Sequence, residues 1–129
     1  MSRVVVIDDC RLTLAMARDI LEEAGLEVFT AESGIEANAA IYGSPPPDLI
    51  LLDVEMPMLR GDRKVELLKR AESSRHIPVV LMSHRRAAEL EALASSSGAD
   101  SFIVKPLRKQ TLLEHLSRFI RIPRPGRPA

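Results

Sequence analysis

The sequence contains few aromatic residues and almost no cysteine. Cys10 is its single cysteine, tryptophan is absent, and aromatic residues make up 3% of the 129 residues. One cysteine excludes an internal disulfide and a metal site built from several thiolates. So few aromatic rings exclude a base-stacking platform for single-stranded nucleic acid. Because an unpaired thiol is typical of a reducing compartment, we expect a cytoplasmic protein.

Net charge and long hydrophobic runs are also lacking. Lys plus Arg and Asp plus Glu each number 18, so the formal net charge is zero. Nucleic-acid binding needs a basic excess, so we expect no direct binding of nucleic acid by this domain. No apolar run approaches the roughly 18 residues of a membrane-spanning helix, and the first residues do not resemble a signal peptide. We therefore expect no membrane partner.

What the sequence has is a regular alternation of short apolar runs and helical patterns. It predicts strands over 4–7, 26–30, 49–52, 78–82 and 101–104, and helices over 11–24, 33–42, 62–73, 86–97 and 108–121. Such an alternation is typical of an α/β protein whose parallel sheet has helices on both faces. Right-handed crossovers favour a doubly wound sheet with strand order 2-1-3-4-5, the flavodoxin-like (βα)5 fold.

We expect this domain to cover residues 1–121. Residues 122–129 contain three prolines, which lack backbone donors and cannot continue a helix, together with Arg124 and Arg127. This segment is predicted to be a tail or the stub of a linker.

The first and second predicted helices carry local signals. The first has two apolar stripes side by side. One consists of Leu12, Met16 and Ile20, and the other of Leu14, Ala17 and Leu21. In the second, Ser33 is followed three residues later by Glu36, a capping box that predicts the start of that helix.

Four predicted strands end in polar residues. Asp8 and Asp9 follow the first strand, Asp53 the third, Ser83 the fourth and Lys105 the fifth. The working site of a doubly wound sheet lies beyond the carboxyl ends of its strands, near the point where the strand order reverses. We therefore predict that these five side chains meet in one site.

The residue types indicate the chemistry of that site. Crowded carboxylates repel one another and need a cation. Hard oxygen ligands without cysteine or histidine suit Mg²⁺, with Mn²⁺ as a substitute. Lysine can hold a phosphoryl group as a point charge, the serine hydroxyl can donate one hydrogen bond to it, and a carboxylate can be the nucleophile. The site is thus predicted to support phosphoryl transfer onto Asp53.

These motifs resemble the receiver domain of two-component response regulators. They are Asp8-Asp9, the segment from Asp53-Val-Glu-Met-Pro to Gly61, Ser83, and Lys105-Pro106. Asp53 lies 44 positions after Asp9, Ser83 a further 30, and Lys105 a further 22. Each motif is weak alone, but together, in order and in register over about residues 3–121, they are specific.

The resemblance implies that Asp53 is the phosphoacceptor of a sensor histidine kinase or phosphotransfer protein. It implies that Asp8 and Asp9 hold Mg²⁺ together with Asp53 and the backbone carbonyl of Glu55. On this reading the domain is a signalling switch rather than a dedicated enzyme, with only self-phosphorylation and autodephosphorylation chemistry.

The same resemblance implies a switch. Ser83 would turn onto the phosphoryl oxygen, and Lys105 would be the ion-pairing lysine, joined to Pro106 by a cis peptide. Phe102 matches the switch aromatic and would rotate inward as Ser83 moves. This would change the face formed by the last two helices and the last strand, through which an output protein, a fused output domain or a second copy of the chain would bind.

Three residues near the site depart from the family pattern. His84 stands where a small residue is usual, and Glu55 and Arg85 flank the entrance, where they could pair. We expect these three residues to slow hydrolysis of the acyl phosphate. Phe102 lacks the hydroxyl of the common tyrosine, which excludes an output that needs that hydroxyl.

Other functions fit the sequence less well. A pseudo-receiver that docks partners independently of phosphorylation would not need all five polar residues. A phosphohydrolase with an aspartyl nucleophile resembles Asp-x-Asp, whereas Asp53 is followed by Val54, Glu55, Met56 and Pro57. A flavin-binding protein of this topology needs a Ser/Thr/Gly-rich loop after the first strand, where this chain has acidic residues.

Overall fold

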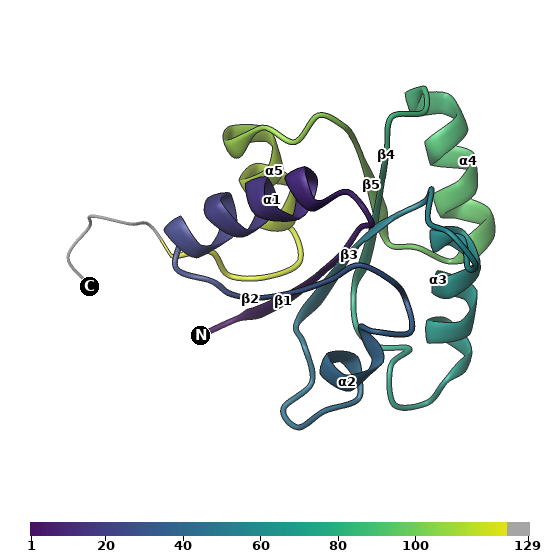
Figure 1. Ribbon diagram of the computed structural model, residues 1–129, viewed down its shortest axis with the longest axis horizontal. Coiled ribbons are helices and arrows are strands. Elements are labelled where there is room, and N and C mark those ends of the chain that lie inside the picture. Colours follow the sequence, from purple (N-terminus) through teal and green to yellow (C-terminus); the bar gives the residue numbers. More distant parts are fainter. Residues whose placement is uncertain (124–129) are drawn as a thin grey trace.

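The computed structural model describes residues 1–123, and these form one parallel sheet covered by helices (Figure 1). The strands are β1 (Arg3–Ile7), β2 (Glu27–Ala31), β3 (Leu49–Asp53), β4 (Val79–Ser83) and β5 (Ser101–Val104). The helices are α1 (Arg11–Glu23), α2 (Asn38–Ile41), α3 (Gly61–Arg70), α4 (Ala87–Ser97) and α5 (Lys109–Leu116). The strand order is β2-β1-β3-β4-β5, and every neighbouring pair is parallel, which confirms the predicted doubly wound fold.

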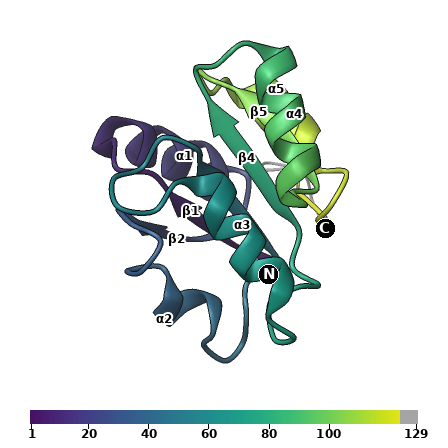
Figure 2. The ribbon, with the colours of Figure 1, turned by 90° about the vertical axis from the view of Figure 1, so that its right-hand side faces the viewer.

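The central strands are buried on both faces. Every residue of β3 and β4 is buried, because helices cover the sheet on each side. Leu14, Leu21, Leu112 and Leu116 of α1 and α5 pack on one face. Val65, Leu68 and Leu90 of α3 and α4 pack on the other, together with Ile41 of α2. In Figure 2, α3 and α4 lie in front of the sheet and α1 behind it.

Only one of the two apolar stripes of α1 is buried along its whole length. Leu14, Ala17 and Leu21 are buried, whereas Leu12 is 69% and Met16 39% exposed. A helix turns by about 100° per residue, so positions two before and two after Leu14 lie nearly opposite it. Leu12 and Met16 therefore lie toward solvent, whereas Ile20 packs against the core.

Helices α2 and α5 are shorter than the sequence predicts. Half of the predicted capping box forms, since Ser33 Oγ accepts the Glu36 N–H at 3.1 Å. The Glu36 carboxylate accepts the N–H of Glu32 instead of that of Ser33, and the N-cap of α2 is Ala37. The turns that follow mix i−3 and i−4 hydrogen bonds, and regular helix begins only at Asn38. Helix α5 ends at Leu116, whose carbonyl accepts from both Phe119 and Ile120 in a tightened last turn.

The structure describes the first two residues of the predicted tail, Ile122 and Pro123. Ile122 packs against the core beneath α1 and α5, and residues 124–129 lie outside the described part of the chain. Within residues 1–123, none of the helices has the length and apolar character needed to span a bilayer.

Candidate functional site

A cavity of about 520 Å³ opens at the carboxyl ends of the strands. Its lining residues are Asp8, Asp9, Cys10, Thr13, Asp53, Glu55, Ser83, His84, Arg85 and Lys105. All five polar residues predicted to meet at the strand ends are therefore brought together. Thr13 was not predicted as a lining residue. Its signal in the sequence is its place in the first turn of the helix that follows the acidic pair and Cys10.

The backbone explains why these side chains converge. Past the end of β1, the Asp8 N–H still donates to Ala31 O at 3.0 Å, and the Asp8 carboxylate accepts the Cys10 N–H at 2.8 Å. The Lys105 N–H continues the β4–β5 pairing by donating to Ser83 O at 2.8 Å. The Lys105–Pro106 peptide is cis, as predicted.

Three carboxylates and one ammonium form the centre of the cavity. Carboxylate oxygens of Asp8, Asp9 and Asp53 lie within 4.8 Å of one another. Asp8 is fully buried, Asp53 is 3% exposed, and Asp9 is exposed. Lys105 Nζ donates to Asp8 Oδ2 at 2.6 Å and pairs with Asp53 Oδ1 at 2.9 Å. The ion pair predicted for Lys105 is present, with Asp8 and Asp53 as its partners.

The surroundings make Asp53 a weaker acid than usual. Burial, then the charges of Asp8 and Glu55, raise its pKa to about 6, although Lys105 opposes this rise. Burial disfavours the charged form of Lys105, but hydrogen bonds to Asp8 and Asp53 outweigh it and raise the lysine pKa. When all four groups are ionised, they carry a net charge of minus two. A divalent cation with a preference for oxygen ligands fits this donor set, and Asp8, Asp9 and Asp53 would hold it.

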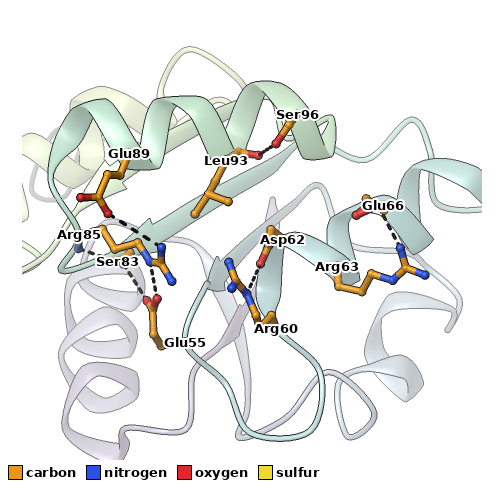
Figure 3. A network of polar contacts seen from close by, with 10 residues as sticks. All are labelled: Glu55, Arg60, Asp62, Arg63, Glu66, Ser83, Arg85, Glu89, Leu93 and Ser96. Atoms are coloured by element: carbon orange, nitrogen blue, oxygen red, sulfur yellow. Dashed lines mark hydrogen bonds and ion pairs between the residues drawn. The ribbon is translucent and has the colours of Figure 1, made fainter.

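A second polar cluster, made of Glu55, Ser83 and Arg85, also lines the cavity. Figure 3 shows its hydrogen bonds and ion pairs. The Ser83 hydroxyl donates to Glu55 Oε2 at 2.8 Å and accepts the Arg85 N–H at 3.0 Å. Arg85 Nε donates to Glu55 Oε1 at 2.5 Å, so the expected pairing across the entrance is present. Burial raises the pKa of Glu55, but the hydrogen bonds from Arg85 and Ser83 outweigh burial and lower it overall. His84 is exposed at the mouth.

Phe102 lies apart from the cavity. It sits on β5 opposite Leu81 of β4, is half-buried, and packs against the core layer of α3 and α4. Val104, two residues further along β5, is 40% exposed. The rotation of Phe102 on phosphorylation stays a prediction.

Comparison with known proteins assigns the family. Residues 4–117 match the response regulator receiver domain, and the chain belongs to this family. Receiver domains of this kind belong to two-component signalling systems, as the resemblance of the motifs predicted.

Relatives are found both as small regulators and as parts of kinases. The chain is 34% identical over 116 residues to the sensor histidine kinase GacS of Pseudomonas protegens, covering 87% of this chain but only 12% of GacS. It is 29% identical to the polar-differentiation response regulator DivK of Brucella ovis, covering 91% of this chain and 94% of DivK.

Solved structures share the fold. The chemotaxis protein CheY4 of Vibrio cholerae superposes with a TM-score of 0.85 at 30% identity, over 93% of this chain and 99% of CheY4. The receiver domain of the sensor histidine kinase PA1611 from Pseudomonas aeruginosa has a TM-score of 0.81 at 20% identity, covering 92% of this chain and 96% of that one. The structure of the PA1611 domain has a magnesium ion coordinated in its active site cleft.

Proposed function

We propose that this receiver domain takes a phosphoryl group from a phosphohistidine onto Asp53 in a Mg²⁺-dependent reaction. The observation that carries the proposal is a nearly buried carboxylate that opens into a cavity, pairs with Lys105, and lies beside two further carboxylates. In the reaction, Asp53 attacks phosphorus through a carboxylate oxygen, the new O–P bond replaces the P–N bond, and the imidazole leaves with the bonding electrons.

Each side chain of the centre has a role in this step. The three aspartates and the backbone carbonyl of Glu55 would hold Mg²⁺. The ion would neutralise charge on the oxygens of the phosphoryl group during transfer. The hydrogen bond to Asp8 holds Lys105 in place, so that its ammonium can exchange the ion pair with Asp53 for one with the phosphoryl group. The Ser83 hydroxyl supplies one hydrogen bond once the acyl phosphate has formed. On this proposal the chain is a phosphoacceptor switch and not a dedicated enzyme.

The phosphodonor protein is proposed to dock beside the mouth of the cavity. A groove of about 200 Å³ lies between α1 and the turn after β5, lined in part by Leu12, Met16, Pro106 and Leu107. It shares Cys10, Thr13, His84 and Lys105 with the cavity of Asp53. A sensor histidine kinase or phosphotransfer protein that covers the exposed Leu12 and Met16 would thereby bring its phosphohistidine to the entrance.

The output partner is proposed to bind a different face of the domain. Helix α4, strand β5 and helix α5 carry the half-buried Phe102 and the exposed Val104. An output protein, a fused output domain or a second copy of the chain is expected to bind there.

Labelling with a small P–N phosphodonor tests the central claim. Phosphoramidate and Mg²⁺ are expected to add one phosphoryl group to the wild type, measured by intact mass, and none to Asp53→Asn or in EDTA. Equal labelling of the variant contradicts the assignment of Asp53. Absence of labelling in the wild type favours a docking pseudo-receiver.

A second measurement tests the docking groove. Leu12→Asp is expected to leave labelling by phosphoramidate unchanged but to slow transfer from a phosphorylated histidine phosphotransfer domain. Leu67→Asp, at an apolar residue of α3 that is 42% exposed, is the matched control. Equal slowing by both variants contradicts the proposed position of the donor.

A further inference from the structure

The hydroxyl of Ser83 is already committed to a partner in the unphosphorylated protein. Ser83 is fully buried, and its hydroxyl donates to Glu55 Oε2 at 2.8 Å while it accepts the Arg85 N–H at 3.0 Å. A hydroxyl has a single hydrogen to donate. It cannot donate to a phosphoryl oxygen on Asp53 until it leaves Glu55.

Glu55 is itself fixed from the other side of the entrance. Arg85 Nε binds Glu55 Oε1, and Arg85 Nη1 lies 3.9 Å from Glu89 Oε2 in the first turn of α4. Figure 3 shows this chain of contacts running from the loop after β3, across the end of β4, to α4. Moving the Ser83 hydroxyl therefore removes a hydrogen bond from Glu55, whose partner Arg85 also contacts Glu89 of α4.

We propose that Glu55 is a positioning residue that, fastened by Arg85, holds the Ser83 hydroxyl away from Asp53 in the unphosphorylated state. This inference rests on the proposed phosphorylation of Asp53. Phosphorylation must exchange one acceptor of the hydroxyl for another, so Ser83 has two discrete arrangements, and Glu55 favours the first. In the second, Glu55 loses a hydrogen bond, and the link from Arg85 to α4 is free to change.

Removing Glu55 tests the proposal. A buried hydroxyl without an acceptor is unfavourable, so in Glu55→Ala the Ser83 hydroxyl is driven to find a new one. Glu55→Ala is then expected to bind the phosphoryl analogue beryllofluoride, with Mg²⁺, roughly tenfold more tightly than the wild type. The free energy of one hydrogen bond to a charged group corresponds to about this ratio of affinities. Affinity is measured by isothermal calorimetry and by fluorine NMR.

The alternative is that the Glu55 carboxylate simply repels an anion, and a double-mutant cycle separates the two cases. The proposal predicts that Glu55→Ala loses its effect when Ser83 is already alanine. Repulsion predicts the same tightening in both backgrounds, and that result overturns the proposal. Glu55→Gln, which keeps a carbonyl acceptor for the hydroxyl without the charge, is expected to fall between the wild type and Glu55→Ala.

Arginine variants supply a matched pair. Arg85→Met is expected to tighten binding of beryllofluoride, although losing a cation at the mouth would by charge alone weaken it. Arg86→Met is the control, because Arg86 Nε binds Glu89 Oε1 at 3.2 Å and is 84% exposed. The proposal predicts no change in this control, and equal changes in both arginine variants contradict it.

Failure of the proposed function gives a different pattern. If neither the wild type nor Glu55→Ala binds beryllofluoride, the assignment of Asp53 as phosphoacceptor is wrong, and the proposal about Glu55 is wrong with it. If both bind with equal affinity, the phosphoacceptor assignment stands and only the role of Glu55 is refuted.

Discussion

We predict that the ionised carboxylate of Asp53 destabilises the metal-free fold. Its pKa rises from 3.8 to about 6, first through burial and then through the charges of Asp8 and Glu55, against the opposing effect of Lys105. Each pKa unit corresponds to about 1.36 kcal/mol, so holding this charge costs the folded state up to about 3 kcal/mol. Asp53→Asn removes the charge and keeps the shape of the side chain. We expect a gain in unfolding free energy of about 1–3 kcal/mol at about pH 8 in EDTA. The gain falls below the full cost of the charge because Lys105 loses one of its two partners.

The pH dependence has a definite sign. Because the pKa of Asp53 is higher in the folded than in the unfolded state, the folded state binds more protons between pH 3.8 and about 6. The unfolding free energy of the wild type therefore falls, through this group, as the pH rises across that window. The unfolding free energy of Asp53→Asn does not fall in this way, because the variant has no carboxyl group at this position. The difference in unfolding free energy between the variant and the wild type should therefore nearly vanish below about pH 4.

Urea unfolding followed by circular dichroism, in EDTA and over a series of pH values, measures both effects. Asp19→Asn, at an exposed residue of α1, is the control and should show no comparable gain. Added Mg²⁺ should stabilise the wild type more than Asp53→Asn, since a cation that binds only the folded state stabilises it. The reasoning is refuted if Asp53→Asn is the less stable protein at about pH 8, or if the difference does not depend on pH.

Two further predictions concern the first residue of α3 and the loop that precedes it. A Cβ at Gly61 would lie 2.0 Å from the carbonyl oxygen of Asp53, so Gly61→Ala should cost about 3 kcal/mol in urea unfolding. Gly34→Ala, whose nearest neighbour at 3.3 Å is the flexible side chain of Lys64, should cost much less, and equal costs would contradict this argument. Met58 has a φ of 70° and is 96% exposed, so Met58→Gly should raise stability by up to about 1 kcal/mol by relieving the left-handed backbone. A loss of stability would show that its side chain packs.

The site could be found from sequence because the strands allow few polar positions. In β3 and β4 every residue is buried, so a charged or polar side chain is tolerated only at the carboxyl end, where Asp53 and Ser83 lie. The topology rule then places those ends together, and the structure agrees. Asp8 and Lys105 follow from the same reasoning, since each stands one residue beyond a strand.

What the sequence did not determine was the choice between partners of similar chemistry. Glu55 and Arg85 were expected to flank the entrance and pair, but nothing in their spacing indicated that Glu55 would also capture the hydroxyl of Ser83. The two stripes of α1 have similar hydropathy, and only the covering of the sheet decides that Leu14 is buried and Leu12 exposed. Such choices depend on side-chain directions in three dimensions, which periodicity does not specify.

The two ion pairs beside Asp53 differ in how readily they can break. The lysine pair is buried, with side-chain exposures of 6% for Lys105 and 0% for Asp8, and removing one partner from such a pair costs about 3–5 kcal/mol. The pair of Arg85 and Glu55 is 34% and 51% exposed, and an exposed pair contributes about 0–1 kcal/mol. A new phosphoryl group can therefore disrupt the second pair far more cheaply than the first. The conformational change should begin on the side of Glu55 and travel toward α4, while the contact between Asp8 and Lys105 stays fixed.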